Sequence, residues 1–267
     1  MSGRSHQQLE IQGVRLEIRV IPGPVDRPAL IFLHEGLGSV TLWRDFPDKL
    51  ARRLGLRAIL YSRRGYGASD PLEGPRKPDF MHREALDVLP ELRRALNLDD
   101  AILVGHSDGA SIALIHAAAG GADHEFGTRG VVLMAPHVFV EDICVTAIAK
   151  ARKAYAETDL KARLARHHTH VDDAFYGWAD VWLSPAFRDW SLLDEVRRLR
   201  APALLIQGTD DAYGTLAQIE RIAEGMLGSA QKVVLGGVGH SPFRDDEGAV
   251  LDAISGFVER LRLDPSA

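Results

Sequence analysis

Residues 101–113 read AILVGHSDGASIA, and this stretch decides the fold. It begins with a short, continuous apolar run, which is typical of a strand covered on both faces. Gly105-His-Ser-Asp-Gly109 follows directly, and a helix of small residues begins after it. A strained serine turn between a strand and a helix needs such glycine neighbours, because larger side chains would clash there. We therefore predict that Ser107 is a nucleophile in this turn; the alternative is that it only caps the helix.

Similar apolar runs recur along the chain and alternate with stretches of helical spacing. Residues 9–20 alternate apolar and polar side chains around Gly13, which predicts an antiparallel hairpin with one buried face. The later alternation of strands and helices predicts a doubly wound α/β fold with a mostly parallel sheet. The predicted strands are 29–33, 58–61, 101–104, 131–134, 203–206 and 232–235, and the predicted helices are 43–54, 80–96, 108–119, 215–226 and 248–261.

One interval does not fit this alternation. Residues 136–200 are about 65 residues, far more than the few that usually join a strand to the next element. The interval has helical patterning and is rich in aromatic side chains. We therefore predict a helical cap, residues 136–200, inserted into one α/β core formed by residues 1–135 and 201–267.

The composition indicates one folded unit that acts on a small molecule. The chain has 267 residues, of which 46% are hydrophobic, so it can bury one large core. A net charge of −5 gives no electrostatic reason to bind nucleic acid or an anionic membrane. The polar start and the lack of an apolar run near the roughly 18 residues of a membrane span predict a cytoplasmic protein. We expect a small-molecule substrate as partner, and a homodimer stays open.

We expect neither a cofactor nor a metal. Cys144 is the only cysteine, so an internal disulfide and thiolate metal sites are excluded. His167, His168 and His170 lie close together in the sequence, but no carboxylate stands at a recognisable ligand spacing. We interpret these three as solvated histidines of the cap.

A protonated serine is a weak nucleophile, so it needs a base and a group that orients the base. His240 ends the glycine-rich turn Gly236-Gly-Val-Gly-His240, between the last predicted strand and the last predicted helix. Loops at the carboxyl ends of parallel strands surround a common site, so His240 can face Ser107. We predict that His240 is the general base; a structural turn histidine is the alternative.

The orienting acid is expected after another predicted strand, in Gly208-Thr-Asp-Asp211. Two adjacent carboxylates cannot both face one imidazole, and we favour Asp211 over Asp210. The alternative is that one of the two aspartates only caps the helix that begins near residues 213–216. Glu141 or Asp142, after the strand at 131–134, is a further alternative.

Taken together, these motifs resemble the successive signatures of the α/β-hydrolase superfamily, and in particular its small bacterial esterases and carbon–carbon bond hydrolases. The resemblance covers nearly the whole chain outside the cap. It implies that the acid lies three residues after the glycine that ends its strand, which is Asp211, and that the chain order is Ser, Asp, His. The motifs are residues 29–34 (ALIFLH), 61–69 (YSRRGYGAS), 105–109 (GHSDG), 208–211 (GTDD) and 239–240 (GH).

A serine in the turn implies a serine hydrolase that acts through an acyl-enzyme, most simply a carboxylic ester hydrolase on a small, largely apolar substrate. Haloalkane dehalogenase and epoxide hydrolase chemistry needs a carboxylate at this position and is excluded. The alternative is a carbon–carbon bond hydrolase of a diketone-type intermediate of aromatic degradation, and a perhydrolase side activity stays open. From another class, a small-molecule receptor could keep the same fold.

The resemblance also implies an oxyanion hole made by the backbone N–H groups of Asp108 and Gly36. Here the chain departs from the usual pattern, because acidic Glu35 follows the loop histidine and acidic Asp108 follows the serine. If both carboxylates face the cavity, repulsion should raise at least one pKa and disfavour anionic acyl groups. We favour the alternative, in which Asp108 faces its own helix N-terminus and Glu35 bonds loop amides.

For the substrate pocket we expect Glu35 and His137, together with aromatic side chains. The cap aromatics, Trp178 and Trp182 among them, fit the core of the cap better than a pocket wall, but ligand sites are typically apolar clefts, so both roles are open. Trp43 is expected at the mouth of the pocket.

Overall fold

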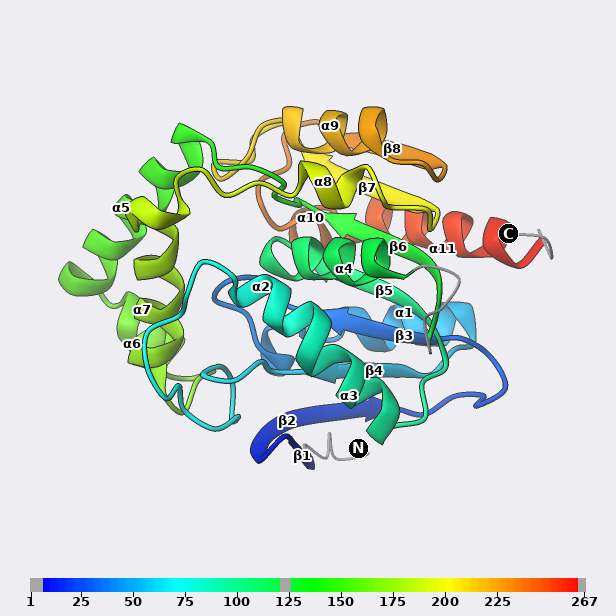
Figure 1. The fold of residues 1–267 in the computed structure, drawn as a ribbon, viewed down its shortest axis with the longest axis horizontal. Coiled ribbons are helices and arrows are strands. Elements are labelled where there is room, and N and C mark those ends of the chain that lie inside the picture. Colours follow the sequence, from blue (N-terminus) through cyan, green and yellow to red (C-terminus); the bar gives the residue numbers. More distant parts are fainter. Residues whose placement is uncertain (1–6, 121–125, 264–267) are drawn as a thin grey trace.

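A computed structural model describes residues 7–120 and 126–263 as an eight-stranded sheet with helices on both faces (Figure 1). The strand order is β1-β2-β4-β3-β5-β6-β7-β8. β1 pairs with β2 and β2 with β4 in antiparallel fashion, whereas all later neighbours are parallel. The strands are β1 Gln7–Ile11, β2 Val14–Ile21, β3 Ala29–Leu33, β4 Ala58–Tyr61, β5 Asp100–His106, β6 Gly127–Met134, β7 Ala203–Gly208 and β8 Ala230–Leu235.

The predicted α/β fold with a mostly parallel, doubly wound sheet is confirmed, and so is the N-terminal hairpin. One expectation about the strands is wrong. β8 does not lie covered on both faces, because it is the last strand of the order and alternates exposed with half-buried residues. Val234 of this strand is 47% exposed. An apolar run therefore did not distinguish an edge strand from a central one.

The helices surround the sheet and also extend from one end of it. Two short 3₁₀ segments, η1 Val40–Trp43 and η3 Pro185–Phe187, accompany them. The helices are α1 Phe46–Leu54, α2 Phe80–Arg83, the π-helical η2 Glu84–Val88, α3 Leu89–Ala95, α4 Asp108–Ala119, α5 Asp142–Glu157, α6 Leu160–Leu164, α7 Val171–Trp182, α8 Leu193–Val196, α9 Ala217–Gly225, α10 Pro242–Asp245 and α11 Glu247–Leu263.

Alternate residues of the central strands enter two separate apolar layers, as the two-residue period of a strand requires. Ile102 and Val104 of β5 pack in the layer that contains α1 and α11. Leu103, between them, packs in the other layer with α3, α4 and α9. Both faces of the sheet are thus buried, which explains why the central strands are continuously apolar.

Two predicted helices are interrupted in the structure. The helix expected at 80–96 contains a π-helical turn, η2, between α2 and α3. Pro90 lies at the start of α3 and has no N–H to donate, and such a residue disturbs the regular hydrogen-bond pattern before it. The helix expected at 43–54 begins only at Phe46, because Arg44 adopts φ 56° and ends the 3₁₀ turn before it.

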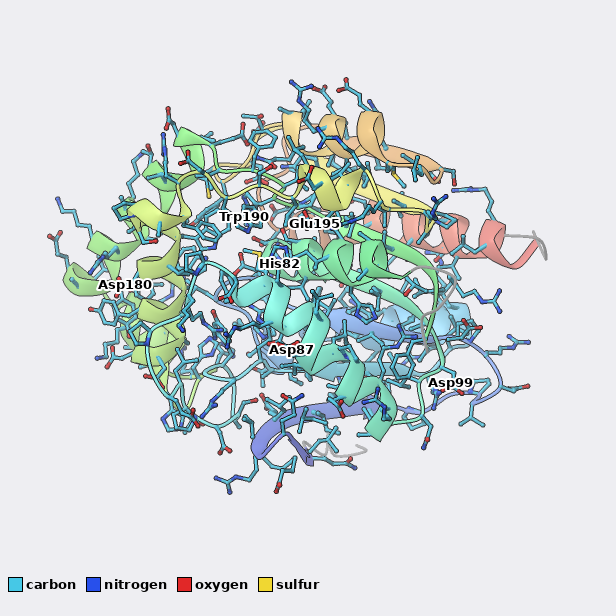
Figure 2. All side chains as sticks on the ribbon, in the orientation of Figure 1. His82, Asp87, Asp99, Asp180, Trp190 and Glu195 are labelled. Carbon is cyan, nitrogen blue, oxygen red and sulfur yellow. The ribbon has the colours of Figure 1, made fainter. Side chains whose placement is uncertain are left out.

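Helices α5 to α8 lie between β6 and β7 in the sequence, and in Figure 1 α5, α6 and α7 extend beyond one end of the sheet. Figure 2 shows His82 of α2 beside Glu195 of α8, where Nε2 lies 3.4 Å from Oε1. This contact joins α8, from the segment between β6 and β7, to α2, from the segment between β4 and β5. Within the described ranges, no helix combines the length and the apolar character that crossing a membrane requires.

Candidate active site

Ser107 lies in a sharp turn between β5 and α4, with φ 53° and ψ −121°. The turn is possible only because the residues two positions before and two positions after the serine are glycines. A Cβ on Gly105 would lie 2.4 Å from the carbonyl oxygen of Gly109, and one on Gly109 would lie 1.9 Å from that of Leu33. The structure therefore holds Ser107 in the strained strand-to-helix turn that its sequence context predicts.

His240 reaches Ser107 from the loop between β8 and α10. Its Nε2 lies 2.9 Å from the Ser107 Oγ, and its Nδ1 lies 2.8 Å from Oδ2 of Asp211. A carboxylate can only accept, so Nδ1 carries a proton and Nε2 is the acceptor for the serine hydroxyl. This tautomer can take the serine proton when Oγ attacks an electrophile.

Asp211 rather than Asp210 lies against the imidazole, in agreement with our preference. Asp211 is 6% exposed and accepts hydrogen bonds from Gln207 Nε2 at 2.7 Å and from the Tyr213 backbone N–H at 2.7 Å, besides that from His240. Burial alone would raise the pKa of Asp211, but the hydrogen bond and charge of His240 outweigh it and lower that pKa. Asp210 is exposed and accepts a hydrogen bond from Thr209 Oγ1 at 2.9 Å.

The other two carboxylates considered from the sequence point elsewhere. Glu141 accepts hydrogen bonds from the Thr215 Oγ1 at 2.6 Å and from Gln218 Nε2 at 2.7 Å. Asp142 pairs with Arg188. Neither contact involves His240.

Sequence reasoning missed two side chains that support this arrangement. Gln207 also donates to the Gly214 carbonyl at 3.1 Å, so it holds the loop that carries Asp211. His106 is fully buried, and its Nε2 donates to the His240 carbonyl at 2.6 Å. Gln207 was detectable in principle, since it is a polar residue in the otherwise apolar strand β7, four residues before the acid. Nothing in the sequence indicates the partner of His106.

The loop after β3 is held by a third unpredicted residue, Arg63. Its guanidinium is 1% exposed and donates to the carbonyl oxygens of His34 and of Glu35, the latter at 3.0 Å. The Glu35 carbonyl also accepts from His34 Nδ1 at 2.7 Å and from the Gly38 N–H at 3.0 Å. In a trans peptide the N–H points opposite to the C=O, so the Gly36 N–H is directed away from these donors.

Gly36 lines the same cavity as Ser107 and Asp108. A Cβ on Gly36 would lie 2.3 Å from the indole of Trp178, so α7 can approach this loop only because the residue is glycine. The structure thus brings both predicted oxyanion residues to one cavity.

The two unusual carboxylates have different partners from those we expected. Glu35 does not rely on loop amides: its carboxylate lies 3.1 Å from Arg244 Nη2 and 3.4 Å from His106 Nδ1. Burial acts to raise the pKa of Glu35, but these two neighbours outweigh burial and keep that pKa below its ordinary value.

Asp108 does not cap its own helix. Its Oδ1 accepts a hydrogen bond from Trp182 Nε1 at 3.2 Å, and Oδ2 lies 4.0 Å from Arg63 Nη2. Burial raises the pKa of Asp108, against the opposing charge of Arg63. Burial, rather than repulsion between two facing carboxylates, is therefore what raises the pKa of Asp108.

The cavity beside Ser107 has a volume of about 200 Å³. This is below the range of roughly 300–1,000 Å³ that is typical for drug-sized ligands, so the cavity fits a small substrate. Glu35, His137, Trp178 and Trp182 line it, as expected, and the two tryptophans also belong to the apolar core. Its remaining wall includes Leu37, Cys144, Ile148 and Tyr213.

Two expectations about this region are wrong. Trp43 does not stand at the mouth of the cavity; it is 1% exposed and packs against Phe32, with ring centroids 5.2 Å apart, and against Phe243 at 4.7 Å. Trp43 therefore belongs to the apolar layer that contains α1 and α11. His168 is not solvated, because it is 3% exposed and bonds the Gly67 N–H at 3.0 Å.

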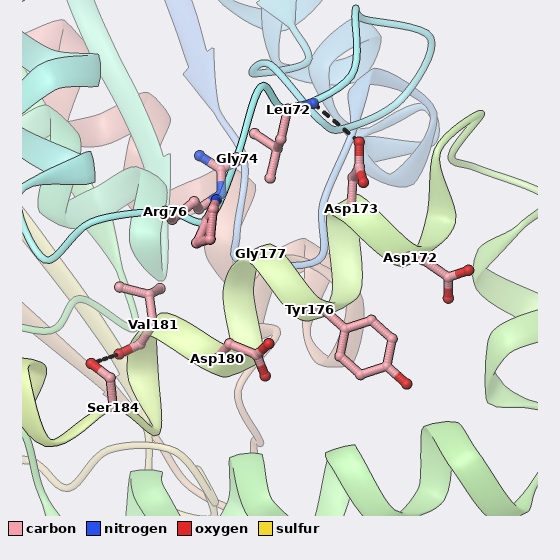
Figure 3. Close-up of a pocket in the computed structure, with 11 residues that line it drawn as sticks. Leu72, Gly74, Arg76, Asp172, Asp173, Tyr176, Gly177, Asp180, Val181 and Ser184 are labelled. Carbon is pink, nitrogen blue, oxygen red and sulfur yellow. Dashed lines mark hydrogen bonds between the residues drawn. The ribbon is translucent and has the colours of Figure 1, made fainter.

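A larger hollow of about 530 Å³ lies between residues 72–76 and α7 (Figure 3). Three aspartates line it, and each has a structural partner. Asp173 accepts from the Leu72 N–H at 3.0 Å, Asp172 pairs with Lys161 at 2.7 Å, and Asp180 pairs with Arg152 at 2.9 Å. These carboxylates bind α7 to neighbouring segments. Ser107 does not line this larger hollow; it lines the smaller cavity described above. Among the described residues, no group of three or more His, Cys, Asp or Glu side chains is arranged to hold a metal ion.

Comparison with known proteins agrees with this fold. Residues 30–253 match the family model described as the alpha/beta hydrolase family. The structure is similar to that of an enol-lactonase from Burkholderia xenovorans LB400, with a TM-score of 0.71 and 24% identity over 97% of this chain and 100% of that chain. It is also similar to a structure reported among carboxylesterases of Nitrososphaera gargenis, with a TM-score of 0.76 and 18% identity over 97% and 100% of the two chains. At these identities the likeness establishes the shared fold.

Two characterised relatives are similar in sequence. A proline iminopeptidase from Lactobacillus delbrueckii subsp. bulgaricus is 22% identical over 90% of this chain and 92% of its own length. An sn-1-specific diacylglycerol lipase from Mus musculus is 30% identical over 118 residues, which are 43% of this chain. The match spans only 37% of the length of that lipase.

Proposed function

Because the chain belongs to the alpha/beta hydrolase family, we propose that it is a serine hydrolase that cleaves carboxylic esters of small, largely apolar substrates through an acyl-enzyme. One observation carries this proposal: an unbroken line of hydrogen bonds runs from Asp211 through His240 to Ser107, at the wall of a small apolar cavity. The similarity in structure to an enol-lactonase and to a structure reported among carboxylesterases supports an ester as the bond that is cleaved.

In the first half of the reaction, Ser107 Oγ attacks the ester carbonyl carbon while His240 Nε2 takes the hydroxyl proton. Asp211 keeps the imidazole in the required tautomer and stabilises the imidazolium that forms. The tetrahedral oxyanion accepts hydrogen bonds from the N–H groups of Asp108 and Gly36, and each such donor is worth about 3 kcal/mol. His240 Nε2 then returns the proton to the leaving alkoxide, and the alcohol departs.

In the second half, water attacks the carbonyl carbon of the acyl-enzyme. His240 takes a proton from the water as it attacks, and the same two N–H groups bind the second oxyanion. When the intermediate collapses, the proton passes to Ser107 Oγ. The carboxylic acid leaves, and the resting serine is restored.

The test is a panel of graded aliphatic esters, aryl esters and dienoate ketones, assayed with the wild-type protein and with Ser107→Ala. We expect turnover of short esters, and a loss of at least about 10³-fold in Ser107→Ala, because the nucleophile is absent. Ser184→Ala is the matched control, since Ser184 Oγ donates to the Val181 carbonyl at 2.8 Å outside the cavity. A fluorophosphonate probe should add its mass to the peptide that contains Ser107.

Wild-type turnover in Ser107→Ala, or labelling of another residue, would overturn the nucleophile assignment. Hydrolysis restricted to the ketones would favour a carbon–carbon bond hydrolase. Tight binding of a panel compound without any hydrolysis would favour a receptor.

A further inference from the structure

Two buried polar atoms at the wall of the cavity beside Ser107 have no hydrogen-bond partner in the described chain: Oδ2 of Asp108 and Nδ1 of His137. The two residues are 1% and 2% exposed. Buried polar atoms are nearly always paired, because leaving one unpaired is costly. Because both residues line one cavity, a molecule bound there can supply the missing partners.

The unpaired Nδ1 of His137 is a hydrogen-bond acceptor. Its Nε2 lies 3.1 Å from the carbonyl oxygen of Tyr213, which can only accept, so the proton of the ring is on Nε2. Burial lowers the pKa of His137 to about 4, so the ring is neutral at ordinary pH. Nδ1 therefore carries a lone pair and calls for a donor.

Oδ2 of Asp108 also lacks a hydrogen-bond donor. Trp182 Nε1 already donates to Oδ1, whereas Arg63, the nearest cation, stands 4.0 Å from Oδ2. Arg63 cannot simply turn toward Oδ2, because its two terminal nitrogens donate to the carbonyl oxygens of His34 and Glu35. The pair is thus balanced in charge, but Oδ2 is unsatisfied as a hydrogen-bonding atom.

The balance of charge decides which donor fits. The charge of Arg63 already compensates that of the Asp108 carboxylate. An ammonium group would therefore be a buried cation without a compensating anion, which is costly. A hydroxyl group adds no charge, and it can donate to the carboxylate or accept from the protonated acid. It therefore satisfies Asp108 in either state of ionisation.

Asp108 and His137 both contact the same side chain, Trp182. Trp182 donates to Asp108, and its ring lies 5.1 Å from the ring of His137 between centroids. The neighbouring wall is formed by apolar and weakly polar side chains such as Ile148 and Cys144.

We propose that the substrate of this site is a hydroxylated ester, whose hydroxyl group hydrogen-bonds Oδ2 of Asp108 and, in a polyol, also Nδ1 of His137. This inference rests on the ester-hydrolase function proposed above. Sites built to bind a substrate hydroxyl reject analogues that lack it, because the polar groups of the site are then left buried and unpaired.

The first test compares shape-matched esters with the wild-type protein. Methyl 3-hydroxybutyrate is paired with methyl 3-methylbutyrate, and 2-hydroxyethyl butyrate with propyl butyrate, so that the hydroxyl lies on the acyl side or on the alcohol side. We expect kcat/KM to be at least about tenfold higher for the hydroxylated ester in one of the pairs. Ratios near one in both pairs would overturn the inference and leave ester hydrolysis intact. If no ester is hydrolysed at all, the proposed function itself fails.

The second test assigns the preference to Asp108. Asp108→Asn keeps the shape of the side chain but replaces one acceptor oxygen by an NH₂ group, so the ratio within the pair should fall toward one. Ile148→Val, which trims the same wall without changing a polar group, should leave the ratio unchanged. A wild-type ratio in folded Asp108→Asn, or faster turnover of 2-aminoethyl butyrate than of the hydroxyethyl ester, would contradict the proposal. If Asp108→Asn does not fold, the wild-type comparison still decides it.

Discussion

At the scale of single residues, two adjacent aspartates have entirely different surroundings. Asp211 receives hydrogen bonds from His240, Gln207 and the Tyr213 backbone, whereas Asp210 lies at the surface beside Thr209. The neighbours of Asp211 keep its carboxylate ionised and fixed in direction. Only a carboxylate in this position can hold the His240 ring with its proton on Nδ1.

Asp211→Asn should therefore lower kcat by roughly three to four orders of magnitude, because the amide can donate to Nδ1 and favour the wrong tautomer. Steady-state kinetics on the best ester of the panel measures this loss. Asp210→Asn is the matched control and should stay within a few-fold of the wild-type kcat. A larger loss in Asp210→Asn than in Asp211→Asn would exchange the two assignments.

At the scale of elements, the turn from β5 to α4 is where three backbones meet. Gly109, at the start of α4, approaches the end of β3 so closely that a Cβ would lie 1.9 Å from the Leu33 carbonyl oxygen. Backbone atoms cannot move aside as a flexible side chain can. The small residue therefore sets how closely the helix can pack on the strand.

Gly109→Ala should lower the free energy of unfolding by about 3 kcal/mol or more, because β3 or α4 must shift. It should also reduce kcat, since β3 leads directly into the loop that contains Gly36. Urea unfolding and ester kinetics measure the two effects. The matched control is Gly236→Ala, where an added Cβ meets nothing within 4 Å and stability should change by no more than about 0.5 kcal/mol. Equal stability of the two variants would contradict the close approach.

At the scale of the whole molecule, His168 ties the helical segment between β6 and β7 to the core. Its Nδ1 accepts from the Gly67 N–H at 3.0 Å, and its Nε2 donates to the Leu37 carbonyl at 3.1 Å. Both bonds require a neutral ring with its proton on Nε2. Burial lowers the pKa of His168 from 6.5 to about 4.

This lowered pKa predicts a loss of stability in acid. Above pH 6.5 the ring is neutral in both states, and its full contribution to stability is present. Between pH 6.5 and about 4 the unfolded chain binds a proton at this histidine that the folded protein does not. The free energy of unfolding therefore falls as the pH falls, and His168 alone accounts for roughly 3 kcal/mol of the decline. Thermal unfolding measured across this range should show a falling Tm.

His168→Gln should make this decline shallower, because glutamine can replace both hydrogen bonds without titrating. Burial also lowers the pKa of His34, His137 and His167, and these histidines keep the remaining part of the decline. His170→Gln, two residues away, is the control and should retain the wild-type slope. An unchanged slope in His168→Gln would show that this histidine is not the acid-sensitive contact.

The sequence by itself determined the architecture, the serine turn and the residues that meet there. The strands of the core, the G-x-S-x-G turn and the glycine-rich loop before His240 are local patterns, so neighbouring residues are sufficient to predict them. Because the carboxyl ends of parallel strands meet at one edge of the sheet, the position of each loop in the chain also predicted that Ser107, Asp211 and His240 would converge.

Only the tertiary structure decided the partners around these residues. Arg63 holds the loop of Gly36, His106 holds the His240 carbonyl, and Trp182 rather than the helix N-terminus bonds Asp108. The same is true of the buried position of Trp43, which the sequence placed at the pocket. In each case the contact joins segments that are distant in the chain, and the choice among several chemically suitable partners depends on how the helices pack against the sheet and each other. No local pattern of side chains carries that information.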